Sequence, residues 1–142
     1  MYIYKSQYVC YSQHMLRYTS FLFGIAVLVA REDPFYHGIL LALTSVTIAR
    51  HYWGGQADSV IASIDRGVAH GCFGLCAYAH LYELPSALGA TCVFLVVGLW
   101  VYEYLMPEDW VRAHVMLHGV AFTGIMVAIE NRRPNYAVTI KM

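Results

Sequence analysis

Residues 84–102 read LPSALGATCVFLVVGLWVY and carry no formally charged side chain. An α-helix rises ~1.5 Å per residue, so a helix of this length would extend about 28 Å, close to the ~30 Å hydrocarbon core of a bilayer. The composition agrees, because the 142-residue chain is 59% hydrophobic and 13% charged, whereas soluble domains carry about 25% charged residues. We therefore expect a transmembrane helix here, in a chain whose main solvent is lipid.

Four other apolar stretches are long enough for similar helices, namely residues 14–30, 34–53, 58–82 and 109–130. Pro34 suits the first position of a helix, and the stretch that it opens ends in Tyr52 and Trp53, which are typical of the membrane interface. Arg17 lies inside another stretch, so its side chain would have to reach back to the interface. No stretch shows the period-2 alternation of a membrane barrel strand. The sequence predicts a single all-α transmembrane domain over residues 1–142, with about five spans.

The connections between these stretches carry the signals of helix ends. Turn-forming or acidic residues occupy positions 31–34, 54–57, 83–85 and 106–109. Asp58 and Asp109 are expected to cap the amino ends of the helices that follow them. Five spans would place the connections after the second and fourth spans on the same side of the membrane. Basic residues are spread evenly over the two sides, so charge predicts neither the orientation nor the host membrane.

The charge balance excludes one broad class of function. Nine basic and nine acidic residues give a net charge of zero, and no basic cluster supports electrostatic binding to nucleic acid. The first residues lack the pattern of a cleaved signal peptide, so we expect none. The partners expected from composition are the lipid bilayer and, as an alternative, other subunits of a membrane complex.

Four ionisable residues fall inside the predicted spans near one face of the membrane: His51, Asp65, His114 and His118. Such residues are costly in lipid, and the first interpretation is a functional site. His114 and His118 stand four residues apart, so both imidazoles lie on one helix face and can bind one ion. His51 would supply a third nitrogen ligand and leave a fourth position open for water, which is the catalytic pattern for zinc. Asp65 could orient or deprotonate that water.

The order of these residues resembles a known superfamily of membrane hydrolases. LTSVTIARHYW contains His51, SVIASIDRGVAHG contains Asp65, and VRAHVMLHGVAF contains the last two histidines. This order is similar to that of alkaline ceramidases, progestin and adiponectin receptors, and lipid-remodelling Per1-like proteins, in a reduced form. The resemblance implies a zinc-dependent hydrolase of a lipid amide or ester. It also implies a hydroxyl one turn before His51, where this chain has Thr47, with Ser45 as the alternative.

Several other interpretations fit the same residues. His114 and His118 could be buried imidazoles hydrogen-bonded to neighbouring helices, and Asp65 could form an ion pair with Arg66. A b-type haem held between His70 and His118 is a second cofactor hypothesis. A non-catalytic accessory subunit, whose polar residues join helices, is a third. The remaining candidates, Cys72, Cys76 and His80, follow one another at four-residue steps, and helix packing explains them better than a metal does.

Overall fold

The computed structural model describes residues 2–53, 60–83 and 85–132, with side chains from Met15 to Tyr52 in the first of these ranges. All regular structure in the described residues is helical, which confirms the expected all-α class. The elements in chain order are α1 (Tyr2–Val29), α2 (Pro34–Trp53), α3 (Val60–Tyr78), the π-helical segment η1 (Ala79–Glu83), α4 (Ala87–Leu105), the 3₁₀ turn η2 (Pro107–Asp109) and α5 (Trp110–Arg132).

The helix boundaries follow local capping chemistry. Helix α2 covers the predicted residues 34–53, and the Asp33 carboxylate accepts hydrogen bonds from the backbone N–H groups of Phe35 and Tyr36 at 3.1 and 3.2 Å. Helix α4 begins at Ala87 rather than 84, because the Ser86 hydroxyl caps it by accepting from Gly89 N–H.

The other boundaries depart from the prediction in different ways. Helix α1 begins at Tyr2, well before the predicted start at 14. Asp109 ends η2, directly before α5, and its carboxylate accepts a hydrogen bond from Tyr102 and lies 3.8 Å from Arg112. The predicted cap Asp58 and the 54–57 turn lie outside the described residues.

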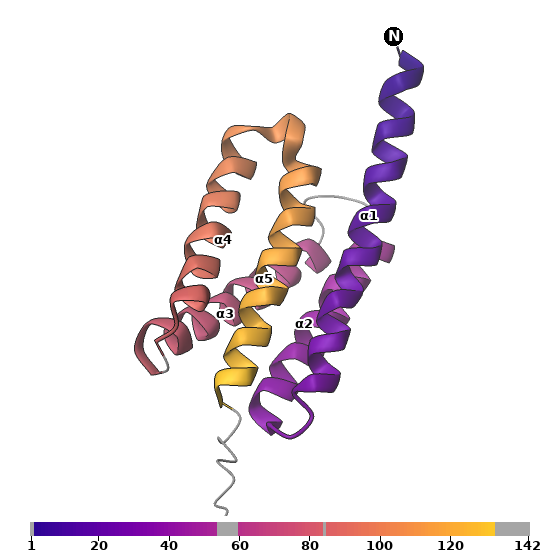
Figure 1. The fold of residues 1–142 in the computed structure, drawn as a ribbon. Coiled ribbons are helices and arrows are strands. Elements are labelled where there is room, and N and C mark those ends of the chain that lie inside the picture. The colour runs from indigo at the N-terminus through magenta and orange to yellow at the C-terminus, as the bar shows by residue number, and fades with distance from the viewer. Residues whose placement is uncertain (1, 54–59, 84, 133–142) are drawn as a thin grey trace, which may run out of the picture.

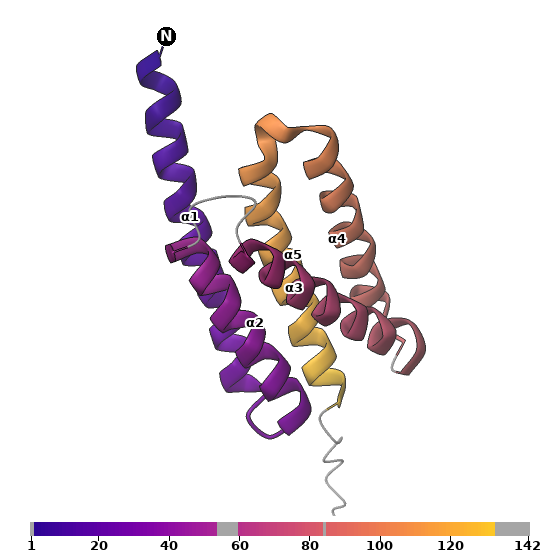
Figure 2. The same ribbon diagram turned by 180° about the vertical axis from the view of Figure 1, so that it is seen from behind.

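Two antiparallel helix pairs and one oblique helix make up the bundle. Helices α1 and α2 form one pair, α4 and α5 form the other, and α1 also packs along α5 (Figure 1). Helix α3 crosses the bundle obliquely and packs mainly on α2, as the view from behind shows (Figure 2). The carboxyl ends of α2 and α4 therefore lie at the same end of the molecule as the start of α5 (Figure 1).

The apolar core lies where α1, α2 and α5 meet. Small buried residues on α1 and directly after it let the neighbouring helices approach closely, since Ala26 and Ala30 are almost fully covered. The core consists of Phe23, Ala26, Val27, Ala30, Tyr36, Leu40, Leu43, Cys72, Ile125, Ala128 and Ile129.

Arg132, at the carboxyl end of α5, links several segments at that end of the bundle. Its guanidinium pairs with the carboxylate of Glu83 and lies 3.9 Å from that of Asp33. It also lies 4.9 Å from the centre of the Tyr36 ring, in cation–π contact. One residue of α5 thus contacts the turn between α1 and α2 and the end of η1.

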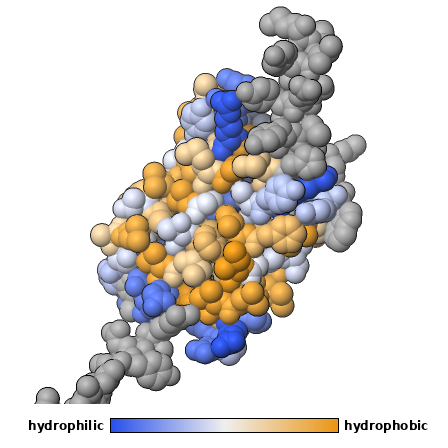
Figure 3. Space-filling view, turned by 45° about the vertical axis from the view of Figure 1, so that its right-hand side comes forward, coloured by the Kyte–Doolittle hydropathy of each residue, from blue (hydrophilic) through white to orange (hydrophobic). Residues whose placement is uncertain are grey.

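Two segments of the described chain are long and apolar enough to cross a membrane: Ala87–Leu105 and Pro107–Arg132. Met15–Val29 forms a shorter apolar stretch. Side chains on α4 such as Phe94 and Leu95 are exposed although apolar. One face of the molecule shows a broad hydrophobic region, with most hydrophilic residues toward its two ends (Figure 3). The all-helical class is therefore established, and five crossings stay a prediction.

Candidate metal centre

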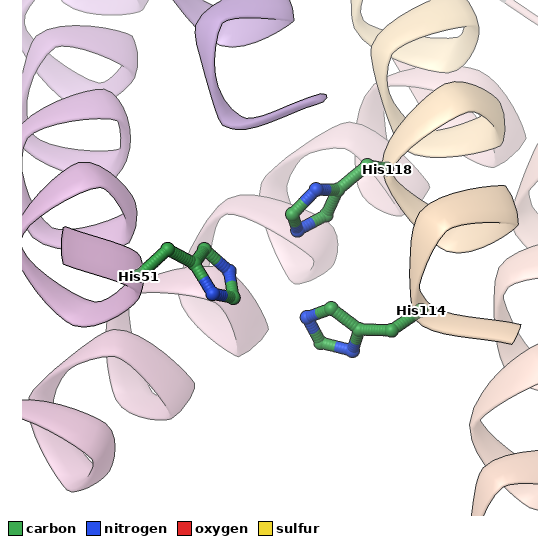
Figure 4. A group of neighbouring side chains, drawn as sticks. All are labelled: His51, His114 and His118. Carbon is green, nitrogen blue, oxygen red and sulfur yellow. The ribbon is translucent and has the colours of Figure 1, made fainter. Parts of the chain in front are cut away.

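Three histidine side chains converge between α2 and α5, as the sequence predicts. The ring centre of His51 lies 5.8 Å from that of His114 and 5.6 Å from that of His118, and the latter two are 4.8 Å apart. One ring nitrogen of each residue lies within 4.8 Å of the corresponding nitrogens of the other two. The three rings extend into one shared space from the two helices (Figure 4).

Helix geometry explains this convergence. His114 and His118 are one turn apart on α5, so their side chains leave the same face. His51 lies near the carboxyl end of α2, where the Arg17 guanidinium of α1 donates a hydrogen bond to its carbonyl oxygen at 3.2 Å. Arg17 also lies over the Tyr52 ring, at 5.2 Å from its centre. The arginine expected to reach toward an interface thus satisfies the end of α2.

Two of the imidazoles are held through their Nδ1 atoms. His114 Nδ1 lies 2.9 Å from Glu103 Oε1 on α4, and His118 Nδ1 lies 2.9 Å from Thr19 Oγ1 on α1. Since the Thr19 hydroxyl can donate to the Leu16 carbonyl at 3.2 Å, it is free to accept from the imidazole. These contacts leave the Nε2 atoms of both rings available. The Nε2 atom of His51 is also buried, and the described chain gives it no hydrogen-bond partner.

This donor set fits a zinc ion. Zinc binds imidazole nitrogen at about 2.0–2.1 Å, so tetrahedral ligands lie about 3.4 Å from one another. The ligand atoms here lie within 4.8 Å of one another, so the rings would move closer together to hold the ion. Hydrogen bonds from the second nitrogen to a carboxylate or hydroxyl are the usual support of histidine ligands. The alternative of hydrogen-bonded packing imidazoles leaves the buried Nε2 atom of His51 without a partner.

Asp65 and Thr47 contact each other beside the histidines. The Thr47 hydroxyl donates to Asp65 Oδ1 at 2.8 Å, and its side chain is only 3% exposed. An upright helix that began at residue 58, as the sequence predicts, would place Asp65 about 10 Å from its start and therefore deeper than His51. Helix α3 is instead oblique (Figure 2), and Asp65 meets α2 at Thr47, one turn before His51. The expected ion-pair partner Arg66 donates through Nε to the Ala62 carbonyl at 3.3 Å.

Ser45 does not reach this group of residues. Its side chain is exposed, and its hydroxyl donates to the Leu41 carbonyl of its own helix at 2.8 Å. Of the two hydroxyls on α2, Thr47 faces inward and Ser45 outward. The prediction that Ser45 could contribute a catalytic hydroxyl is not supported by this geometry.

A cavity of about 550 Å³ opens beside the histidines, between α3, α4 and α5. Its polar lining includes Thr47, Asp65, Glu103, His114 and His118. Its other walls are mainly apolar or aromatic and include Phe23, Leu43, Phe73, Val93, Val96, Trp100, Leu117 and Ile125. A cavity of this size, with a few polar groups at one place, is typical of a small-molecule or lipid-chain site.

The other candidates from the sequence, His70, His80 and Cys72, lie outside the group of three histidines. His70 is exposed, its ring lies 4.7 Å from Trp100 at an angle of 30°, and its Nδ1 bonds the Arg66 carbonyl. His118 contacts the two other imidazoles. His80 is 2% exposed, and its Nε2 lies 2.9 Å from the Gly124 carbonyl. Packing explains His80 and the buried Cys72, as expected.

Sequence reasoning missed Glu103 and Thr19. Glu103 follows the uncharged stretch 84–102 directly and reads as the charged end of a span. It lies two residues before the end of α4, and His114 lies four residues after the start of α5, so the antiparallel pair brings the two side chains together. Thr19 carries no comparable signal, because its contact depends on how α1 packs on α5.

Comparisons with protein-family models, with curated proteins and with solved structures give no match.

Proposed function

We propose that this protein is a membrane-embedded, zinc-dependent hydrolase of a lipid amide or ester. The observation that carries the proposal is the convergence of His51, His114 and His118, with ligand atoms within 4.8 Å of one another, beside a largely apolar cavity. Three nitrogen ligands with a fourth position open are typical of catalytic rather than structural zinc. The resemblance in residue order to the alkaline ceramidase superfamily supports the same class.

The surrounding side chains suit hydrolysis. A bound zinc ion would supply a Lewis acid and lower the pKa of a coordinated water toward about 7. Asp65 is the proton acceptor in this proposal, because it lines the same cavity as the histidines. The Thr47 hydroxyl donates to one oxygen of that carboxylate and leaves the other oxygen to receive a proton. Thr47 is therefore proposed to orient Asp65.

The cavity walls favour a substrate with a long apolar chain. Val93 and Val96 of α4 and Leu117 of α5 line it with aliphatic side chains, and polar groups gather near the histidines. A lipid would place its amide or ester carbonyl at the polar part and its acyl chain against these walls. The exposed apolar side chains of α4 and the two membrane-length segments suit a protein that draws this substrate from a bilayer.

Zinc content and lipid turnover test the proposal. The detergent-purified chain is expected to hold about one zinc per molecule and to release fatty acid from a long-chain lipid amide or ester. His51→Ala, His114→Ala and His118→Ala should each lower both quantities. His37→Ala is the matched control, because His37 is a half-buried histidine whose Nδ1 contacts the Val27 carbonyl, far along α2 from the site. Circular dichroism checks that each variant keeps its helices.

Other outcomes would overturn the proposal. A wild-type chain that folds without zinc supports an accessory subunit, in which the polar residues only join helices. A Soret band in the optical spectrum supports the haem alternative with His70 and His118. Zinc without turnover of any long-chain amide or ester would support the metal centre but contradict the proposed hydrolase activity.

A further inference from the structure

We infer that Glu103 and Thr19 are positioning residues that select which nitrogen of two imidazoles faces the metal. This inference rests on the proposed metal centre and assigns roles to two residues outside the predicted ligand set. Each contacts a histidine of α5 at 2.9 Å, one from α4 and the other from α1. Both contacts involve the same ring atom, Nδ1, although they come from opposite sides of α5.

The chemistry of the partners fixes the tautomer of His114. A neutral imidazole carries one N–H, and its other nitrogen offers the lone pair that a metal needs. An ionised carboxylate can only accept a hydrogen bond. Glu103 therefore requires the proton to be on Nδ1 of His114, and the lone pair is left on Nε2.

The same logic applies to His118 through a hydroxyl. The Thr19 side chain donates to the Leu16 carbonyl at 3.2 Å and can then accept the Nδ1 proton of His118. Nε2 of His118 carries the lone pair as a result. The buried Nε2 of His51, which has no hydrogen-bond partner in the described chain, completes a set of three like atoms.

Charge gives Glu103 a second role. Zinc and three neutral imidazoles carry two positive charges, which an apolar bundle solvates poorly. Glu103 and Asp65 both line the cavity next to the histidines, and together they carry two negative charges. Both carboxylates, when ionised, would offset the charge of a dication among hydrophobic helices, where the Arg66 guanidinium of the same cavity adds a further positive charge.

Zinc affinity, measured by competition with a chromophoric chelator, tests the two residues separately. Glu103→Ala should weaken zinc binding about 10- to 100-fold, the range for removing the partner of a metal ligand. Glu103→Gln keeps an acceptor and loses the charge, so a smaller loss is expected. Thr19→Val should weaken binding, and Thr19→Ser, which keeps the hydroxyl, should restore it. Glu83→Gln is the matched control, because Glu83 also pairs with an α5 side chain, at the other end of the bundle.

Nitrogen-15 NMR of the metal-free protein provides a readout that does not depend on zinc. In the wild type the ring proton of His114 should be on Nδ1, and Glu103→Ala should move it largely to Nε2. A wild-type ring protonated on Nε2 would overturn the inference even in a chain that binds no metal. Unchanged zinc affinity in Glu103→Ala and Thr19→Val would overturn it while zinc in the wild type still supports the proposed function.

Discussion

Hydroxyl groups in these helices show which side chains have a task outside their own helix. In a helix interior a serine or threonine can satisfy its hydroxyl by donating to the carbonyl four residues earlier. Ser20, Thr44, Ser45, Thr91 and Thr123 all do so, at 2.7–2.9 Å. Thr47 instead donates to Asp65 on another helix. The Thr47 hydroxyl lies one turn from His51, and its hydrogen bond holds the Asp65 carboxylate in place.

Removing the Thr47 hydroxyl tests whether its hydrogen bond holds Asp65 in place. Thr47→Val keeps the shape of the buried side chain but leaves Asp65 Oδ1 without its donor. If Asp65 accepts a proton during hydrolysis, turnover of a lipid amide should fall about 10- to 100-fold, as for other groups that orient a metal site. Zinc content should stay at the wild-type level, since the hydroxyl contacts no proposed ligand. Steady-state turnover and elemental analysis measure the two quantities.

Two variants control for this prediction. Thr47→Ser keeps the hydroxyl and should retain most of the activity. Ser45→Ala removes an exposed hydroxyl that bonds only its own helix, so it should behave as the wild type. Full activity in Thr47→Val would contradict the role given to this hydrogen bond.

The contact between η1 and α4 shows how closely the elements fit. Gly89 lies against the buried ring of His80, and a Cβ atom at this position would stand 2.0 Å from His80 Nδ1. The ring cannot easily turn away, because its Nε2 bonds the Gly124 carbonyl of α5. A single imidazole thus joins three helical segments, and it requires glycine on one of them.

Gly89→Ala should therefore destabilise the bundle by about 1–3 kcal/mol, the usual cost of overpacking a buried site. Thermal unfolding in detergent would show a lower melting temperature. Gly98→Ala on the same helix is the control, because no atom lies within 4 Å of its added Cβ. Alanine is favoured over glycine inside helices by about 1 kcal/mol, so the control should be as stable as the wild type or more so.

A double variant separates the clash from other effects. In a His80→Ala background the added methyl group meets no ring, so Gly89→Ala should cost less than in the wild type. An equal cost in both backgrounds would show that the His80 contact is not the cause.

The sequence predicted the elements better than their arrangement. Charge-free length revealed α4, and Pro34 marked the start of α2 correctly. The three histidines could be found because the spacing of two and the order of all three are local properties of the chain. The tilt of α3 could not be found, because it results from packing against α2 and not from any pattern in residues 58–82. For the same reason the contact of Asp65 with Thr47 could only be seen in three dimensions.

The distribution of polar residues over the whole molecule suits a bilayer. Apolar side chains cover much of the outer face of α4, and the ion pairs of Arg132 and Arg112 lie at opposite ends of the bundle. Arg132 contacts both Asp33 and Glu83, so the turns after α1 and after η1 lie at one end. The turn between α4 and α5 lies at the other (Figure 1).

Labelling from the two sides of a membrane tests how many helices cross it. Single cysteines at Glu32, Pro85 and Glu108, three exposed positions, would be introduced into a chain whose four natural cysteines are replaced by alanine. Five crossings predict that Glu32→Cys and Pro85→Cys react with an impermeant maleimide from the same side of sealed vesicles, and Glu108→Cys from the opposite side.

Each alternative topology gives a different pattern in this experiment. If α3 alone stays on one side, Glu32→Cys and Pro85→Cys should react from opposite sides. If α4 does not cross, Pro85→Cys and Glu108→Cys should react from the same side. Either result would contradict the five-span prediction.

The contacts of Arg132 also constrain the order in which the fold can form during synthesis on the ribosome. Arg17 can reach the carbonyl of His51, and Thr47 can reach Asp65, as soon as the first three helices have emerged. In the described part of the chain Arg132 joins the turns after α1 and η1, and the helix that carries it also brings two of the three imidazoles. The contacts that α5 makes at both ends of the bundle can therefore form only after the other described helices have been synthesised.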